Sequence, residues 1–323
     1  MNRIRQRLPK EEWQAFDDIV MQRVLGASRH IQMIGEMFKS IAKEGVKKQR
    51  SVIEVCDDIK AVAQYFIATR GEASQAVSNA ILIMINDIDE IRGLSLEEAK
   101  SNICEKVDAY QKKSRKDIEL VVEYGARLGQ KMNRIMVFDY SSTVDAFLRR
   151  LGEAKCSMEV IIPESRSING GYDFVGACKE AGLKIHFIPD AAMMYYLRDC
   201  QGVFIGAETF YADGTAFNTT GSDIAGLLCK EFSVPLYVLT PMVKLDSRPI
   251  QGFVRDAVIN DLKERMSGAG FKDEELDEVD FACPELLPVS KEHIHAYVTE
   301  YGVIPVNGMF SVCAEYKKNY MKG

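Results

Sequence analysis

The sequence has little of what marks metal centres, disulfide-stapled domains and cofactor sites. Its 323 residues include eight cysteines without a CxxC or CxH spacing and four histidines without a metal-ligating spacing. These patterns predict neither a metal site nor a disulfide framework, and no motif indicates a bound cofactor. We expect the cysteines to be free thiols in a reducing cytoplasm.

Long apolar segments are also missing. No run approaches the roughly 18 apolar residues of a membrane span, and the charged residues 1–13 lack the apolar stretch of a secretory signal. The net charge of −6 argues against a nucleic-acid or anionic-membrane surface as the main role. Two basic runs, residues 47–50 and 112–116, are typical of solvated helix faces or loops, with a binding patch as the alternative. We therefore expect a cytoplasmic protein with no membrane partner and no direct nucleic-acid partner.

The sequence does contain enough apolar residues for a sizeable core. Hydrophobic residues make up 47% and charged residues 27% of the chain, and its length predicts about two domains. The first 128 residues predict helices, because apolar residues recur there at helical spacing, as at Val55, Ile59 and Val62. Ser95, with Glu98 three residues later, is typical of a helix start. The expected helices cover residues 13–25, 30–41, 51–69, 73–88 and 94–128.

Beyond residue 129 the pattern changes to short apolar runs that alternate with helical segments. Such alternation indicates a parallel sheet covered by helices on both faces. We therefore expect an α/β fold with a helical domain, residues 1–128, followed by a sheet domain, residues 129–323. The expected strands are residues 134–138, 158–162, 184–188, 203–205 and 235–239, and the helices between them are expected to end near residues 151, 181, 198 and 230. Residues 268–279 predict a polar, acidic loop, and residues 292–305 a short helix with a final strand.

Polar side chains follow these strands, at the points where the strands are expected to end. The carboxyl ends of parallel strands meet at one edge of a sheet, where ligands bind in this fold class, so we expect a small-molecule cleft there. Arg166 is suited to grip a phosphate or carboxylate, with an ion pair to Glu164 or Asp190 as the alternative. Asp190 suits either a substrate hydroxyl or a helix start, and Lys244 by itself is typical of a solvated loop. The polar residues at the strand ends are Asp139, Tyr140, Ser141, Glu164, Ser165, Arg166, Asp190, Glu208 and Lys244.

Residues 203–230 combine a strand, a turn and a helix start. Residues 212–215 are a tight-turn signal, and the polar stretch 218–222 leads into an apolar-periodic helix. A polar, glycine-containing loop at a helix N-terminus favours anions through its free N–H groups and the helix dipole. Together with the acid Glu208, this pattern suggests a phosphorylated small molecule. A plain strand, turn and capped helix without a ligand is the alternative.

Six short motifs occur in a fixed order and carry a family resemblance. They are residues 162–166 (IPESR), 189–192 (PDAA), 203–208 (VFIGAE), 212–214 (ADG), 218–222 (NTTGS) and 299–305 (TEYGVIP). With them the sequence resembles the family that joins the alpha, beta and delta subunits of eukaryotic translation initiation factor 2B to aldose–ketose isomerases acting on ribose 1,5-bisphosphate and 5-methylthioribose 1-phosphate. The resemblance covers roughly residues 20–310. It implies an N-terminal helical domain, a Rossmann-like C-terminal domain, and homodimers or larger homo-oligomers built through the C-terminal domains.

The resemblance also implies which residues hold a sugar phosphate and which catalyse its isomerisation. Tyr140 stands where the isomerases have a catalytic cysteine, and Glu208 stands where they have an aspartate. In the phosphate site Arg70 is kept, whereas an arginine and a lysine are replaced, in Leu25-Gly26-Ala27 and Asn218-Thr219 respectively. The resulting ligand-binding candidates are Gly26, Ala27, Arg70, Ser141, Glu164, Arg166, Asp190, Asn218, Thr219, Gly221 and Lys244.

These replacements favour binding over catalysis. Tyrosine has a pKa near 10 against about 8.5 for cysteine, so Tyr140 is a poor base, and Glu208 carries its carboxylate one methylene further out. Losing two cations removes charge-assisted hydrogen bonds of about 1.5–3 kcal/mol each, so a bisphosphate is expected to bind weakly. The first hypothesis is a divergent family member that binds a phosphorylated sugar or nucleotide without the Cys/Asp isomerase chemistry. The second is a sugar-phosphate isomerase in which Glu208 shuttles the proton with help from Asp139 or Tyr140, and a translation-factor subunit is a third interpretation.

Overall fold

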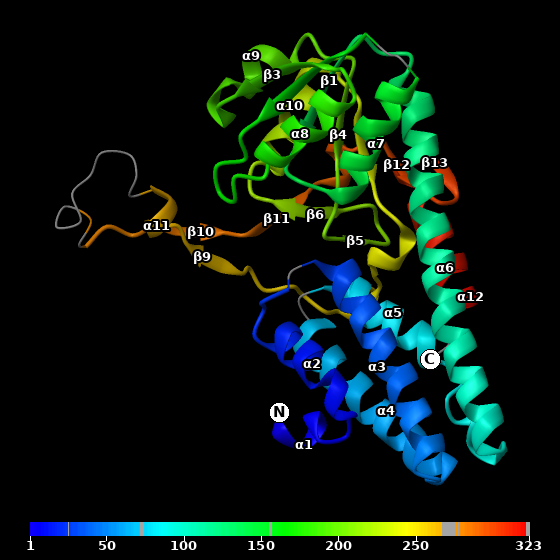
Figure 1. Ribbon diagram of the computed structural model, residues 1–323. Coiled ribbons are helices and arrows are strands. Elements are labelled where there is room, and N and C mark those ends of the chain that lie inside the picture. Colours follow the sequence, from blue (N-terminus) through cyan, green and yellow to red (C-terminus); the bar gives the residue numbers. More distant parts are fainter. Residues whose placement is uncertain (25, 72–73, 155–156, 267–275, 277, 321–323) are drawn as a thin grey trace. The chain divides into compact units, whose positions relative to one another are not determined.

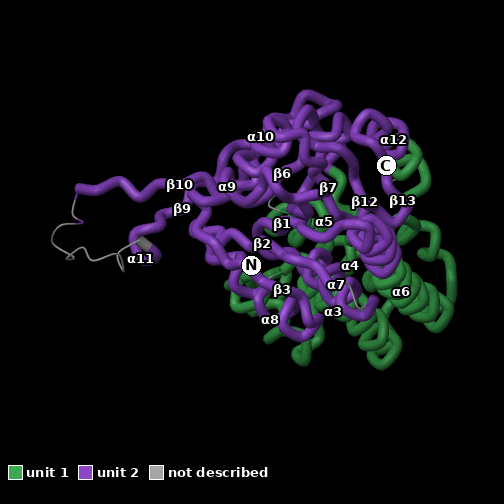
Figure 2. The backbone as a smooth tube through the Cα atoms, turned by 90° about the horizontal axis from the view of Figure 1, so that it is seen from above, with its two compact units in different colours: residues 1–116, 243–245, 314–323 green, residues 117–242, 246–313 purple. Residues whose placement is uncertain are grey.

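The chain divides into two compact units, which Figure 2 shows in different colours. The computed structural model in Figure 1 describes residues 1–24, 26–71, 74–154, 157–266, 276 and 278–320. Unit 1 comprises Met1–Lys116, Val243–Leu245 and Ala314–Gly323, and unit 2 comprises Asp117–Met242 and Asp246–Cys313. The division after residue 116 falls inside one long helix, α6 (Leu96–Gly129). The domain boundary expected between residues 128 and 129 stays a prediction.

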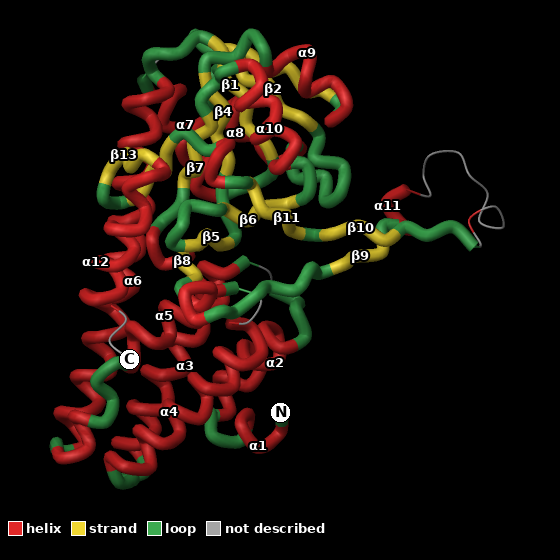
Figure 3. The backbone as a smooth tube through the Cα atoms, turned by 180° about the vertical axis from the view of Figure 1, so that it is seen from behind, coloured by secondary structure: helices red, strands yellow, loops and turns green. Residues whose placement is uncertain are grey.

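Unit 1 is built of helices, as the apolar spacing predicts (Figure 3). Ser51 begins α4 with a capping box, because its hydroxyl accepts the Glu54 N–H while the Glu54 carboxylate accepts the Ser51 N–H. The apolar faces of the helices meet in one core that includes Phe16, Phe38 and Phe66, each at most 1% exposed. The helices of this part are α1 (Asn2–Arg5), α2 (Trp13–Val20), α3 (Ala27–Lys47), α4 (Val52–Phe66), a π turn η2 (Ile67–Gly71), α5 (Gln75–Ile85) and the first part of α6.

Unit 2 contains a sheet of seven described strands in the order β13-β12-β7-β4-β1-β2-β3, and all but β13 run parallel. Along β1, Ile135 and Val137 face a core shared with α7 and α8, whereas the Phe138 ring lies against Gly221 at the start of α10. Helices therefore cover both faces, and the predicted α/β fold class is confirmed (Figure 1). The strands are β1 (Arg134–Phe138), β2 (Glu159–Pro163), β3 (Lys184–Ile188), β4 (Gly202–Ile205), β7 (Leu236–Leu239), β12 (Ala296–Thr299) and β13 (Gly302–Pro305), and the helices are α7 (Ser142–Glu153), α8 (Tyr172–Glu180), α9 (Met193–Leu197) and α10 (Ser222–Phe232).

A hairpin follows β4 and carries polar residues toward α10. Its strands, β5 (Thr209–Tyr211) and β6 (Ala216–Thr219), enclose the tight turn that the sequence predicts. The Tyr211 N–H donates to the Thr215 carbonyl over 2.8 Å, and Gly214 adopts a φ of +91°. The sequence does not indicate three further strands: β11 (Leu286–Val289), which pairs antiparallel with β6, and β9 (Ile259–Asp261) with β10 (Ala282–Pro284), which form an antiparallel ribbon.

The C-terminal segment corrects one expectation. The sequence predicts a short helix and one final strand in residues 292–305. The structure has a short 3-10 helix, η9 (Lys291–His293), but two strands follow it, β12 and β13, paired as an antiparallel hairpin. Gly302 adopts a φ of +114°, which closes the two-residue turn between them. An unpredicted helix, α12 (Met309–Tyr320), follows. The acidic loop predicted at residues 268–279 lies largely outside the described residues, and none of the described helices is long and apolar enough to cross a membrane.

Replacing Gly214 with alanine is expected to destabilise the protein. A Cβ at this position would carry the strain of a positive φ and would lie 2.6 Å from Val306 Cγ2. We expect Gly214→Ala to lower the free energy of unfolding by about 1–3 kcal/mol, measured by urea denaturation followed by circular dichroism. Gly176→Ala is the matched control, because a Cβ there has no atom within 4 Å in the described structure and adds helix propensity to α8. Equal effects of the two substitutions would contradict this account of the turn.

Candidate ligand-binding site

The carboxylate of Asp139 is the centre of the polar cluster at the carboxyl edge of the sheet. Asp139 follows β1 directly, has a φ of +59° and is only 3% exposed. The Ser165 hydroxyl donates to its Oδ1 over 3.2 Å, and the Thr219 hydroxyl donates to the same carboxyl group. Burial, with a smaller contribution from the charge of Glu208, raises the pKa of Asp139 to about 6 despite these donors. The cluster thus brings two carboxyl groups together and keeps one of them close to titration at neutral pH.

Two glycines allow the loops to close over this cluster. A Cβ on Gly170 would lie 2.3 Å from Asp139 Oδ1, so only glycine permits the loop after β2 to approach the carboxylate. A Cβ on Gly206 would lie 2.6 Å from the Cβ of Ser141, which begins α7 as its N-cap residue. The close approach of these segments depends on both glycines.

The loop after β2 is held by the loop after β3. The Asp190 carboxylate accepts the backbone N–H groups of Ser165 and Arg166, each over 2.8 Å. Asp190 is therefore not a helix N-cap, because Pro189 has that position. Both of its carboxylate oxygens already accept hydrogen bonds from the protein. The Arg166 guanidinium lies 3.6 Å from the Glu164 carboxylate and is 46% exposed, which matches the ion-pair alternative for this residue.

Side chains of neighbouring residues form hydrogen bonds with some of the polar groups at the start of α10. Asn218 donates to the Ser222 hydroxyl over 3.0 Å, and both residues are buried. The N–H of Gly221, which has a φ of +104°, donates to the Asp223 carboxylate over 3.0 Å, and the Thr220 N–H donates to the carbonyl of Glu285. An internal carboxylate thus takes one of the donors that a ligand phosphate would use. The site carries more acids than the sequence motifs alone indicated.

Tyr140, the residue in the place of the family cysteine, directs its ring toward α8 and is partly exposed. Its side chain is 41% exposed, and its ring centroid is 5.6 Å from that of Phe174 in α8. Burial of part of the ring raises the pKa of Tyr140 above the ordinary value of a tyrosine. A phenol with a raised pKa is a poor general base near neutral pH.

The remaining candidates belong to unit 1. Gly26, with a φ of +96°, is the N-cap residue of α3, and Ala27 is its first residue; Leu25 lies outside the described residues. Arg70 is in the π turn η2, and its Nη2 donates to the Val20 carbonyl over 2.6 Å. Lys244 is the last residue of the turn η5 (Met242–Lys244). The carbonyls of the residues on either side, 243 and 245, accept hydrogen bonds from the Asn79 side-chain amide.

Sequence reasoning missed the parts played by Ser165 and Asp223. The sequence pattern indicates Ser165 only as one of the polar residues at a strand end, although this residue is fully buried and donates to Asp139. Asp223 had a local signal, since an acid in the first turn of a helix favours its free N–H groups. No three His, Cys, Asp or Glu side chains are grouped to hold a metal ion in the described part of the chain.

Five of the seven described cysteines are buried and all seven are free thiols; Cys156 lies outside the described residues. Burial raises the pKa of Cys178, Cys200 and Cys313 to about 12. These thiols are therefore protonated and unreactive in the folded protein.

The parallel sheet, with its polar loops at the carboxyl edge, defines an α/β protein of the Rossmann-like class preceded by a helical unit. The sequence model of the Initiation factor 2 subunit family matches residues 26–306. The chain belongs to this family, which confirms the resemblance found in its motifs.

The relatives and solved structures that are similar to the chain include both sugar-phosphate isomerases and eIF2B subunits. The chain is 24% identical to the ribose 1,5-bisphosphate isomerase of Archaeoglobus fulgidus over 307 residues, which cover 95% of this chain and 93% of that protein. Its fold is similar to that of the 5-methylthioribose 1-phosphate isomerase of Pyrococcus horikoshii, with a TM-score of 0.75, 17% identity, and coverage of 97% of this chain and 92% of that one. It is also similar to a chain of the tetrameric eIF2B-beta2-delta2 complex from C. thermophilum, with a TM-score of 0.66, 14% identity, and coverage of 94% and 93%.

Replacing Asp139 with asparagine is expected to change how stability depends on pH. The pKa of Asp139 is raised in the folded state, so the folded protein binds this proton more tightly than the unfolded chain does. Its contribution to stability is therefore present at acid pH and is lost as the pH rises from about 4 to about 6. Asparagine also tolerates the left-handed backbone, so Asp139→Asn should keep the loop conformation.

We expect the stability of the wild type relative to Asp139→Asn to fall by about 2–3 kcal/mol between pH 4 and pH 7. Urea denaturation of both proteins at several pH values measures this difference. All other titrating groups are common to the two proteins and cancel in the comparison. A difference that stays constant with pH would contradict the assignment.

Proposed function

We propose that the protein binds a small phosphorylated sugar or a nucleotide at the carboxyl edge of the sheet in unit 2. The single observation that carries this proposal is the buried Asp139 carboxyl group, which Ser165 and Thr219 hydrogen-bond and which lies near Glu208. Desolvating a carboxyl group is costly for a fold, and groups with strongly perturbed pKa values concentrate at functional sites. The family relationship to sugar-phosphate isomerases supports the same ligand class.

The charges of the cluster favour a ligand with many hydroxyl groups and few negative charges. Asp139, Glu208 and Asp223 are acids of this edge, and the guanidinium of Arg166 already lies beside Glu164. Carboxylates accept hydrogen bonds from sugar hydroxyls but repel a second phosphate. We infer that a monophosphate is preferred over a bisphosphate.

Isomerisation of the bound sugar is the second candidate function, and the Asp139–Glu208 pair favours it. Aldose–ketose isomerisation moves a proton between two neighbouring carbon atoms, which requires a group that can both accept and return it. Two nearby carboxyl groups can divide these acid and base roles, and the raised pKa of Asp139 suits that group to carry a proton near neutral pH. In this alternative Glu208 takes the proton from carbon and Asp139, with a pKa of about 6, exchanges a proton with the sugar oxygen.

The proposal also covers the location and the oligomeric state of the protein. We infer a cytoplasmic protein that forms homodimers or larger homo-oligomers. A related C. thermophilum chain belongs to a tetrameric complex of beta and delta subunits, which supports assembly into an oligomer.

Glu208→Gln is expected to weaken ligand binding about tenfold, because it removes one charge-assisted hydrogen bond to a ligand hydroxyl. A thermal-shift screen of ribose phosphates, deoxyribose phosphates, methylthioribose phosphate and nucleotides identifies the ligand, and titration calorimetry measures the change. NMR of the sugar carbons then tests for ketose formation.

Glu153→Gln serves as the matched control, since Glu153 ends α7 and pairs with Arg150 on the surface. It should bind the ligand as the wild type does. Ketose formation that disappears in Glu208→Gln would replace the binding function by the isomerase function. Absence of stabilisation by every phosphorylated compound would overturn both.

A further inference from the structure

Unit 1 contains a pocket of about 440 Å³ that is separate from the edge cluster of unit 2. The turn between α3 and α4, the side of α4 and the chain segment after α1 form its walls. Its floor is apolar, with Leu8 4% and Ile41 1% exposed. Its charged lining consists of Arg7, Lys48, Arg50, Glu44 and Asp58. The volume is within the range of pockets that hold small molecules, roughly 300–1,000 Å³.

One buried acid holds two guanidinium groups at this pocket. Asp58 is 7% exposed; its Oδ1 accepts from Arg7 Nη1 over 2.6 Å and its Oδ2 accepts from Arg50 Nη2 over 2.7 Å. Each guanidinium has five N–H donors, and the bond to Asp58 takes one of them. The shared carboxylate therefore fixes both arginines side by side while most of their donor capacity is left for another acceptor.

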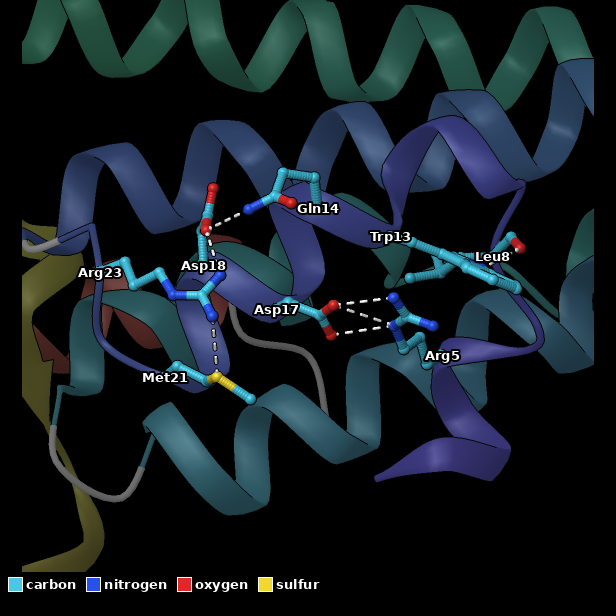
Figure 4. A network of polar contacts seen from close by, with 8 residues as sticks. All are labelled: Arg5, Leu8, Trp13, Gln14, Asp17, Asp18, Met21 and Arg23. Atoms are coloured by element: carbon cyan, nitrogen blue, oxygen red, sulfur yellow. Dashed lines mark hydrogen bonds and ion pairs between the residues drawn. The ribbon is translucent and has the colours of Figure 1, made fainter.

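The segment that carries Arg7 is itself fixed on both sides (Figure 4). Arg5 binds the Asp17 carboxylate through Nε and Nη2, at 2.9 and 2.8 Å, and its guanidinium carbon lies 4.2 Å from the Trp13 ring centroid. The Trp13 indole N–H donates to the Leu8 carbonyl over 3.1 Å. Because residues on either side of Arg7 are anchored to α2, little ordering is needed to place its guanidinium at the pocket.

The lining has an excess of positive charge. Three cations and two acids give a net charge of +1, and the exposed Lys48 ammonium pairs with Glu44 over 2.7 Å. Hydrogen bonding by Lys48, followed by the charges of Lys48, Lys47 and Arg50, lowers the pKa of Glu44, so this acid is ionised and still outnumbered. The basic run at residues 47–50 therefore supplies a concave site, not only a solvated helix end.

We propose that this pocket binds the phosphate group of a small phosphomonoester, with Arg7 and Arg50 as bidentate donors, Lys48 as the third cation, and the apolar floor against the body of the ligand. Planar guanidinium groups match phosphate oxygens in geometry, and a pair held by one carboxylate is pre-organised for them. The site is distinct from the one in unit 2, so the protein has a second place for a phosphorylated compound. The alternative is a purely structural ion-pair network that holds the first residues of the chain against α4. Such a network would have the same contacts but no affinity for phosphate.

Equilibrium dialysis with radiolabelled inorganic phosphate at low ionic strength tests the site. We expect Lys48→Gln to weaken phosphate binding about tenfold, which corresponds to one charge-assisted hydrogen bond. Lys47→Gln is the matched control, because Lys47 is the neighbouring exposed lysine, carries the same charge and does not line the pocket. It should bind phosphate nearly as the wild type does.

Arg7→Gln provides a second variant, since its guanidinium is 43% exposed and Arg50 still pairs with Asp58 in its absence. We expect it to weaken phosphate binding at least as much as Lys48→Gln does. Phenyl phosphate should bind more tightly than inorganic phosphate through the apolar floor. Equal affinity of the two compounds would overturn the assignment of the floor.

Equal effects of Lys47→Gln and Lys48→Gln, or no phosphate binding up to about 10 mM, would overturn the site itself. Glu208→Gln should leave phosphate binding by the pocket of unit 1 unchanged, while it weakens the binding of the ligand in unit 2. Failure of either site is therefore visible without failure of the other.

Discussion

The burial of the Asp139 carboxyl group is the constraint on which the edge of the sheet depends. A carboxyl group that is 3% exposed needs partners, and they come from the loop after β2, at Ser165, and from the last residue of β6, Thr219. Those segments must approach closely, which explains why a glycine lies against Asp139 at residue 170. The Asp190 carboxylate then fixes the loop after β2 through two backbone N–H groups. Four separate strand ends are thus tied to one another by polar contacts.

The sheet could be predicted from the sequence because its signal is local. The strands β1 and β3 have the predicted bounds, since each is a short apolar run between polar or glycine-containing segments. The strand β11 was missed because Leu286–Val289 contains a proline and lies far from β6, with which it pairs. Its position depends on a partner strand about 70 residues earlier in the chain, which no local pattern reveals.

The candidate site was predictable by position but not by role. The motifs correctly placed Asp139, Glu164, Arg166 and Asp190 at strand ends. Their contacts are tertiary, however: the bonds from Asp190 span 24 and 25 residues, and the Ser165–Asp139 bond spans 26. The raised pKa of Asp139 likewise follows from desolvation by segments that meet only in the folded chain. The same holds in unit 1. A basic run that is typical of a solvated helix face lines a pocket there, because the buried Asp58 carboxylate binds Arg50 of this run together with Arg7.

The buried cysteines have a practical consequence. Cys56 in α4, Cys178 in α8, Cys229 in α10 and Cys313 in α12 are distributed over both units and are shielded in the native state. A thiol reagent can reach each of them only when the surrounding segment opens, so the rate of alkylation at each cysteine reports the free energy of that local opening. The chain therefore carries natural reporters of its own regional stability, without the introduction of any label.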